Sequence, residues 1–581
     1  MQKNQSSYME EVEFIIDSEM TYRDHKNLRK LLILIITLII TLTFLNFNRA
    51  QSYNKYERVQ FESSGAILFA NLYYPSKTLE FQEKQPLIIY CHGLASKRDF
   101  DLRIPIEFTK RGFYVASLDY QGHGESSGKI TNIDPITGIP ALAQDCSRLL
   151  DKLETLPFYL NINTSQIGLI GHSLGGMVVL MNQALDPRFI VTVALAPAVN
   201  FDPALLGIGE PEFIDYLPVN LLNEENTNNL LIIMHVEDEV LDFKENALKA
   251  QELTNCTVIP LRGPLLGGGH QLFSDIVLID SINWFENHFF KSMTINGPII
   301  ITFYLNYVLI FLNIILLFII IISLISVSSR IFFRKKYKSK EIDSLSHKTS
   351  LTTSTKRKQI LKIILYLYSF SLNWLIFEKI FSIRGILYGS LNIIFFYVVL
   401  RLLAILKKHK HERSKLRIKE IIKSQFKLKY IVFTIICSVY FIGIYMIFSF
   451  YYPFGFIWPS NFVIHFTLGY LAFPVFLSIE ILLRKVIYPQ LNYLKTENSK
   501  NRVLILSTII IMIILMLLTM KISHFPSVLF MYIIFLMVIL QNTKILQYIK
   551  SFYPVVIISF SIIQIFFATV LSNAIGVNII L

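Results

Sequence analysis

The sequence of 581 residues predicts two architectures in one chain: an α/β domain with an eight-stranded, mostly parallel sheet, and an all-α transmembrane bundle, with about nine spans in total. In one region the apolar runs are short, β-branched and separated by helical patterns, which is typical of a sheet covered on both faces. Elsewhere the apolar runs are long and uncharged. The charge is also unevenly distributed. Residues 49–291 contain 18 Lys and Arg against 29 Asp and Glu and are acidic, whereas the whole chain has a net charge of +13, so the remainder is strongly basic.

Composition excludes several classes of protein. Hydrophobic residues make up 53% of the chain and charged residues only 17%, which excludes a purely soluble or a disordered protein. Four cysteines exclude a disulfide-dense scaffold. The basic run at 407–420 has the composition of a nucleic-acid arm, but it lies between two apolar runs and indicates a cytoplasmic loop. We therefore expect a bilayer and no nucleic acid as partner.

Basic residues indicate which side of the membrane each segment occupies. We expect a cytoplasmic tail over 1–30, a signal anchor over 31–48, an extracytoplasmic domain over 57–290 and a multi-span region over 296–581. A cleaved signal peptide is the alternative for 31–48. The loops 330–362, 407–429, 484–502 and 544–550 are all basic, as cytoplasmic loops are. The further predicted spans are 292–329, 363–377, 385–400, 430–450, 461–479, 503–520, 522–541 and 554–571.

The extracytoplasmic segment contains eight candidate strands separated by candidate helices. The strands are expected at 58–63, 66–74, 86–92, 113–119, 166–172, 189–196, 230–236 and 256–261. Helices are expected at 102–110, 139–156, 174–185, 242–253 and 274–290. Strands that alternate with helices predict parallel pairing, so the carboxyl ends of the strands meet at one edge.

The sequence GHSLGG, Gly171 to Gly176, follows a predicted strand and precedes a predicted helix. It matches the nucleophile elbow G-x-S-x-G in its required context. A Cβ at Gly171 or Gly175 would collide with backbone in so tight a turn, and Ser173 is expected to be strained with its hydroxyl exposed. The pattern predicts Ser173 as a nucleophile.

A serine hydroxyl needs a histidine to take its proton and a carboxylate to orient that histidine. Asp238 follows the strand at 230–236, and His270 follows the strand at 256–261, so both fit the expected chain order. The alternative acids are Glu237, Glu239 and Asp242. A further alternative is that these three residues and Asp238 form a solvated acidic turn. The competing bases are His235, expected in the core, and His288, expected late in the closing helix.

Acyl transfer also requires donors for the oxyanion that develops on the carbonyl oxygen. One expected donor is the backbone N–H of Leu174, directly after the nucleophile. The second is expected from the loop after the third strand, which contains His92, Gly93 and Leu94, and we assign it to Leu94. His92 and Gly93 are expected to shape this loop. The alternative for this loop is an ordinary glycine turn that supplies no oxyanion donor.

Five segments together resemble the α/β-hydrolase fold, nearest to its monoacylglycerol-lipase-like and serine aminopeptidase (proline-iminopeptidase-like) members. They are YCHGLASKRD, LDYQGHGESSGK, GLIGHSLGGMVVL, EDEV and GGGH. The resemblance covers about 230 residues and implies acyl-enzyme chemistry. In that family the motif at 119–126 usually reads D-x-R-G-H-G-x-S, so Gln121 replaces an arginine, a change expected to alter a structural hydrogen bond. The family's acid usually follows a glycine-containing turn, where this chain has His235 and Val236.

These features predict a membrane-anchored serine hydrolase, an esterase or lipase acting on lipid or lipid-linked acyl esters. The segment between the sixth and seventh strands has only about thirty residues, too few for a multi-helix lid. A serine aminopeptidase is the main alternative, with Glu210, Glu212 and Asp215 as an acidic pocket for the amine. A hydrolase fused to a transporter or lipid-handling module is the second alternative, and a catalytically dead hydrolase is disfavoured. We expect neither a cofactor nor a metal.

Overall fold

The computed structural model describes most of the segment predicted to be extracytoplasmic and part of the apolar remainder. The described residues are 28–94, 96–98, 101–207, 209, 211–265, 268–291, 297–344, 391, 393–395, 397–399, 425–451, 462–491, 494, 496–519, 525–549 and 551–574. The chain separates into two compact units, of which one consists mainly of residues 41–312 and the other of residues from the apolar remainder.

The first unit contains one eight-stranded sheet, and all eight predicted strands are confirmed. The strand order is β1-β2-β4-β3-β5-β6-β7-β8; β1–β2 and β2–β4 pair antiparallel, and every other neighbouring pair is parallel. The strands are β1 (Tyr53–Ser63), β2 (Ala66–Pro75), β3 (Gln85–Cys91), β4 (Tyr114–Asp119), β5 (Ile162–His172), β6 (Val191–Leu195), β7 (Leu230–His235) and β8 (Thr257–Leu261).

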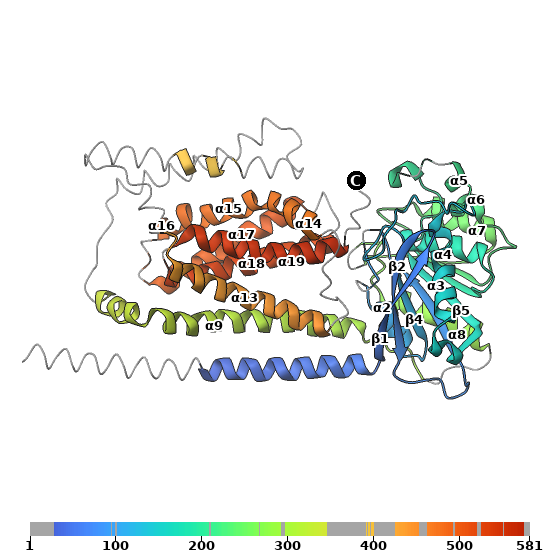
Figure 1. Ribbon diagram of the computed structural model, residues 1–581, viewed down its shortest axis with the longest axis horizontal. Helices are drawn as coiled ribbons and strands as arrows, with labels where there is room; N and C mark the ends of the chain where they lie inside the picture. Colours follow the sequence, from blue (N-terminus) through green and yellow to red (C-terminus); the bar gives the residue numbers. More distant parts are fainter. Residues whose placement is uncertain are drawn as a thin grey trace, which may run out of the picture. The chain divides into compact units, whose positions relative to one another are not determined.

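Helices cover both faces of this sheet (Figure 1). Ile167 and Leu169 of β5 pack in one apolar cluster with residues of α3 and α4. A Cβ added to Gly168, which lies between them, would be 2.5 Å from the Phe285 ring of α8. Because successive strand residues point to opposite faces, α8 covers the face opposite α3 and α4. These helices are α2 (Arg103–Thr109), α3 (Asp145–Glu154), α4 (Leu174–Leu185), α7 (Lys249–Thr254) and α8 (Asp275–Phe290).

The segment between β6 and β7 forms only short helical pieces. They are η3 (Pro203–Leu206), α5 (Pro211–Ile214) and α6 (Pro218–Leu221), each four residues long. Proline stands at the start of all three, where its missing N–H costs no intrahelical hydrogen bond. The small cap expected from the sequence is therefore present.

The second unit is helical and apolar. Side chains from α9, α13, α18 and α19 share one buried cluster, which includes Phe333, Phe433, Cys437 and Ile545. The helices are α9 (Phe303–Ser344), α13 (Leu428–Tyr451), α14 (Phe462–Gly469), α15 (Phe473–Ile481), α17 (Glu497–Thr519), α18 (Phe525–Tyr548) and α19 (Phe552–Ala574). The first residues of α9, up to Leu312, belong to the first unit. In Figure 1, α13, α17, α18 and α19 run alongside one another.

The prediction of nine spans is not supported. Within the described ranges, two helices are long and apolar enough to cross a membrane, Leu28–Ala50 and Phe303–Ser329. The apolar stretches Leu428–Val439, Ile533–Tyr548 and Phe552–Ile565 are shorter. The predicted span 461–479 is divided, because a 3₁₀ turn (Tyr470–Ala472) separates α14 from α15. The predicted span 363–377 and most of 385–400 lie outside the described residues.

Candidate active site

Ser173 is the single residue between β5 and α4. Its backbone has φ 56° and ψ −117°, a conformation that side-chain-bearing residues rarely adopt. The turn is held by the Ser173 N–H, which donates to the carbonyl of Leu195 at 2.9 Å. This geometry leaves the Ser173 side chain partly exposed at the carboxyl end of β5.

The glycines around Ser173 are required by close backbone contacts. A Cβ at Gly171 would lie 2.2 Å from the carbonyl oxygen of Gly175. A Cβ at Gly175 would lie 2.3 Å from the carbonyl oxygens of both Cys91 and His92. Helix α4 therefore begins directly against the end of β3, and only glycine permits that approach.

His270 contacts both Ser173 and Asp238. Its Nε2 lies 2.9 Å from Ser173 Oγ, and its Nδ1 lies 2.8 Å and 3.0 Å from the two carboxylate oxygens of Asp238. The side chains of His270 and Asp238 are 5% and 0% exposed, so water does not compete for these hydrogen bonds. With Asp238 accepting the Nδ1 proton, Nε2 is free to accept the proton of the serine hydroxyl.

The Asp238 carboxylate is fixed by its own turn as well as by His270. Its Oδ1 accepts hydrogen bonds from the N–H groups of Val240 at 2.8 Å and Leu241 at 2.9 Å. Burial alone would raise the pKa of Asp238, but the hydrogen bond and charge of His270, together with these two N–H groups, hold the pKa below its ordinary value. The carboxylate is therefore ionised at neutral pH.

The alternative acids and bases lie elsewhere. Asp242 accepts from the N–H groups of Lys244 and Glu245 at the start of the next helix. Glu239 accepts from the backbone N–H of His270 at 3.2 Å rather than from its ring. His235 Nε2 lies 2.8 Å from the Gly263 carbonyl, and His288 Nδ1 lies 2.7 Å from the Trp284 carbonyl. Of the candidate acids, Asp238 is the one whose carboxylate meets the His270 ring.

The loop after β3 reaches Ser173. A Cβ at Gly93 would lie 3.4 Å from the Cβ of Ser173. His92 points into the protein, where its Nδ1 lies 2.8 Å from the Gly93 carbonyl and its ring stacks on Tyr120 at 4.7 Å between centroids. Leu94 follows with its side chain 42% exposed. The backbone N–H groups of Leu94 and Leu174 as oxyanion donors stay a prediction.

Sequence reasoning missed two groups that hold the His270 loop. His172 Nε2 lies 2.8 Å from the His270 carbonyl. Burial and the charge of His270 lower the pKa of His172 to about 4, so His172 is neutral and donates this hydrogen bond through Nε2. Arg103 donates to the carbonyl of Leu272 at 2.9 Å. Arg103 lies four residues after the segment YCHGLASKRD, in helix α2, and no local pattern marked it.

Gln121 occupies the place expected for an arginine and is fully buried. Its backbone N–H and side-chain amide donate to Asp145 at 3.0 Å and 3.4 Å. Burial raises the pKa of Asp145 to about 6, although the hydrogen bonds from Gln121 and Ser63 act in the opposite direction. The charge on the neighbouring Asp119 is paired instead with Arg98, which keeps the pKa of Asp119 below its ordinary value despite burial. Gln121 therefore makes buried structural hydrogen bonds, and the change relative to an arginine stays a prediction.

The acidic residues considered for an aminopeptidase pocket belong to the segment between β6 and β7. Glu212 and Asp215 are exposed at the short helix α5 and the residue after it. Glu210 lies outside the described residues.

Comparisons with known proteins find a family match over part of the hydrolase domain. Residues 82–236 match the family described as serine aminopeptidase, S33 (Hydrolase_4). The chain is 27% identical over 186 residues to a platelet-activating factor acetylhydrolase of Cavia porcellus, covering 25% of this chain and 41% of that protein. It is 23% identical over 250 residues to the platelet-activating factor acetylhydrolase of Gallus gallus, and the match covers 34% of this chain and 54% of that protein. The chain thus spans about half or less of these curated relatives.

Solved structures include similar folds. The esterase Est1E of Butyrivibrio proteoclasticus, solved with ferulic acid, is 18% identical with a TM-score of 0.30, covering 39% of this chain and 95% of that one. The acylaminoacyl peptidase of Pyrococcus horikoshii is 16% identical with a TM-score of 0.34, and the match covers 42% of this chain and 43% of that one. With the sheet topology and the family match, the region around Ser173 is an α/β-hydrolase domain with an eight-stranded, mostly parallel sheet, similar to serine hydrolases.

Proposed function

We propose that the protein is a membrane-anchored serine hydrolase that cleaves carboxylic esters through an acyl-enzyme. The observation that carries the proposal is the position of the His270 ring, with Nε2 at 2.9 Å from Ser173 Oγ and Nδ1 at 2.8 Å from Asp238. A nucleophile, a base and an orienting carboxylate in this order are the requirement for activating a serine hydroxyl.

The proposed reaction proceeds in two halves. Ser173 Oγ attacks the ester carbonyl carbon while its proton passes to His270 Nε2, and the carbonyl oxygen becomes an oxyanion that the N–H groups of Leu94 and Leu174 stabilise. The carbon–oxygen bond of the ester then breaks, and His270 returns the proton to the departing alkoxide. In the second half a water molecule, deprotonated by His270, attacks the acyl carbon. The bond between that carbon and Ser173 Oγ breaks, His270 returns the proton to Oγ, and the carboxylic acid leaves. Asp238 remains ionised and stabilises the imidazolium in both halves.

Two features favour esters at a lipid surface over peptides. Both curated relatives are named acetylhydrolases, which supports hydrolysis of a small acyl group. The two apolar helices Leu28–Ala50 and Phe303–Ser329 flank the hydrolase domain in the sequence, so insertion of both would hold that domain beside a bilayer. Basic flanking residues favour the extracytoplasmic side for the domain.

The aminopeptidase alternative is favoured by the description of the matching family. It requires an anionic group to bind the free α-amine of a substrate. Of the three acidic residues considered for this role, Glu212 and Asp215 are exposed, and Glu210 lies outside the described residues. An additional lipid-handling or transport role for the helical unit is the further alternative.

An impermeant fluorophosphonate probe applied to intact cells tests the chemistry and the sidedness together. We expect covalent labelling of the wild-type protein and none of Ser173→Ala. Equal labelling of both would exclude Ser173 as the nucleophile, and labelling only after the cells are opened would exclude an extracytoplasmic site. Hydrolysis rates of short acyl esters and aminoacyl amides, compared on the same preparation, distinguish the esterase from the aminopeptidase.

A further inference from the structure

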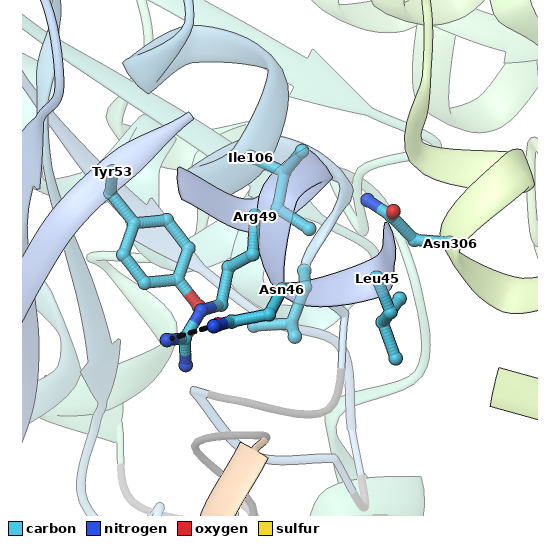
Figure 2. A pocket seen from close by; sticks show the side chains of 7 residues that line it. Leu45, Asn46, Arg49, Tyr53, Ile106 and Asn306 are labelled. Atoms are coloured by element: carbon cyan, nitrogen blue, oxygen red, sulfur yellow. Dashed lines mark hydrogen bonds between the residues drawn. The ribbon is translucent and has the colours of Figure 1, made fainter. Parts of the chain in front are cut away.

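Helix α2 lies against three segments that are distant in the sequence. Its seven residues are all buried. At its beginning it contacts the loop that carries His270, and at its end it contacts the residues that begin α9. Leu102 and Ile106 also line a small pocket together with residues from the end of the helix Leu28–Ala50 (Figure 2). The short helix therefore touches the loop that carries His270 and both segments that adjoin the apolar helices.

Arg103 is the residue of α2 that holds the His270 loop. Its Nη1 donates to the carbonyl oxygen of Leu272 at 2.9 Å, and its guanidinium lies 4.3 Å from the centroid of the Phe273 ring. Asp101 fixes the guanidinium through hydrogen bonds of 2.6 Å and 3.0 Å. Arg103 is only 3% exposed, so these contacts are shielded from water. The planar guanidinium can donate in several directions at once, which a lysine ammonium at this place cannot reproduce.

The segment that Arg103 holds has a strained backbone. Leu272 has a φ of 51°, in the left-handed region that a leucine rarely adopts. Such a conformation persists only where surrounding contacts over-determine it. Leu272 is two residues from His270, so release of its carbonyl would allow the histidine loop to relax away from Ser173.

The other end of α2 is joined to the start of α9. Glu107 Oε1 accepts hydrogen bonds from the backbone N–H groups of Thr302 at 2.9 Å and Phe303 at 2.7 Å. Lys110 Nζ donates to the Ile300 carbonyl at 2.7 Å. Glu107 is 1% exposed, and its carboxylate satisfies N–H groups that the first turn of a helix leaves without intrahelical partners. A displacement of the α9 start would therefore pull on α2.

We propose that Arg103 is a positioning residue for His270, and that α2 relays the position of the α9 start to the histidine loop. The proposal rests on the proposed serine-hydrolase function. Arg103 touches neither Ser173 nor the ring of His270; it acts through the carbonyl of Leu272. In this arrangement a conformational change at the beginning of α9 alters the reactivity of Ser173.

The experiment uses the full-length chain in its membrane and compares Arg103→Gln, Arg103→Lys and Glu107→Ala with a matched control, Arg111→Gln. Alanine at 107 removes the oxygen that accepts from Thr302 and Phe303. Arg111 directly follows the same helical segment and forms a bidentate ion pair with Glu286, at 2.7 Å and 2.8 Å, but does not contact the His270 loop. The two readouts are the rate at which a fluorophosphonate labels Ser173, and kcat and KM for p-nitrophenyl acetate. Thermal unfolding of each variant monitors folding.

For Arg103→Gln we expect the labelling rate and kcat to fall about 30-fold or more with KM changed less than about twofold, because a displaced base costs rate rather than binding. Arg103→Lys, which retains one donor, is expected to lose less, Glu107→Ala about threefold to tenfold, and Arg111→Gln less than about twofold. Arg103 variants that react at the rate of Arg111→Gln would overturn the positioning role. A wild-type rate in Glu107→Ala alone would overturn the relay. If Ser173→Ala is labelled like the wild type, the proposed function fails instead.

Discussion

Replacing Asp238 with asparagine tests the role of the carboxylate without removing its turn. Asparagine has the same shape, and its Oδ1 can still accept from the N–H groups of Val240 and Leu241, which lie 2.8 Å and 2.9 Å from Asp238 Oδ1. The amide NH₂ then takes the place of Oδ2, which is 2.8 Å from His270 Nδ1. An NH₂ group only donates, and Oδ1, which is 3.0 Å from Nδ1, already accepts from two backbone N–H groups, so the amide favours a His270 that accepts at Nδ1 and carries its proton on Nε2. A protonated Nε2 cannot take the proton of Ser173.

We expect kcat for ester hydrolysis to fall by about 10⁴-fold, or about 5.5 kcal/mol of transition-state stabilisation, with the fold retained. The assay is steady-state hydrolysis of p-nitrophenyl acetate together with the fluorophosphonate labelling rate. Asp242→Asn is the matched control, because Asp242 accepts from two backbone N–H groups in the same way, at 2.8 Å and 3.0 Å, without contacting His270. An Asp238→Asn variant that keeps a tenth of the wild-type kcat would refute the assignment of the acid.

Two further predictions concern stability. Gly175→Ala should abolish folding or lower the unfolding temperature by many degrees, since its Cβ would lie 2.3 Å from two carbonyl oxygens, whereas Gly209→Ala, with open space around it, should leave the unfolding temperature within about two degrees. Burial raises the pKa of Asp145 in the folded protein to about 6. The protonated carboxyl therefore stabilises the fold at a pH below the pKa of the unfolded chain. This stabilisation, up to about 3 kcal/mol, is lost as the pH rises through 6. Denaturant unfolding at pH 4 and pH 7 should therefore show Asp145→Asn gaining stability relative to wild type at the higher pH; an unchanged difference would contradict this.

The parts of the site that the sequence predicted depend on local chain geometry. Ser173 could be identified because the tight turn between β5 and α4 demands glycine at fixed offsets, and these glycines are visible in the sequence. Asp238 and His270 could be proposed because parallel strands deliver the residues after their carboxyl ends to one edge of the sheet. The choice between Asp238 and Glu239 required coordinates, because both acids contact His270. Asp238 contacts the ring at Nδ1, whereas Glu239 accepts from the backbone N–H.

The parts that the sequence could not predict depend on contacts between distant segments. Arg103 lies 169 residues from the carbonyl that it holds, and an arginine on a short helix has no pattern to distinguish it from a surface residue. The count of nine spans is not supported by the residues that the structure describes. One predicted span is interrupted by a 3₁₀ turn at Tyr470–Ala472, a backbone feature that hydropathy does not measure.

The small cap has a consequence for selectivity. The segment between β6 and β7 places only three four-residue helical pieces after the sixth strand. Selection among acyl chains requires a pocket that buries each added methylene, at about 0.8 kcal/mol each, and short pieces of this kind provide little enclosed apolar surface. Ser173 is itself partly exposed. Discrimination by the protein among long acyl chains should therefore be weak, and the substrates hydrolysed fastest should be those that the bilayer concentrates beside the domain.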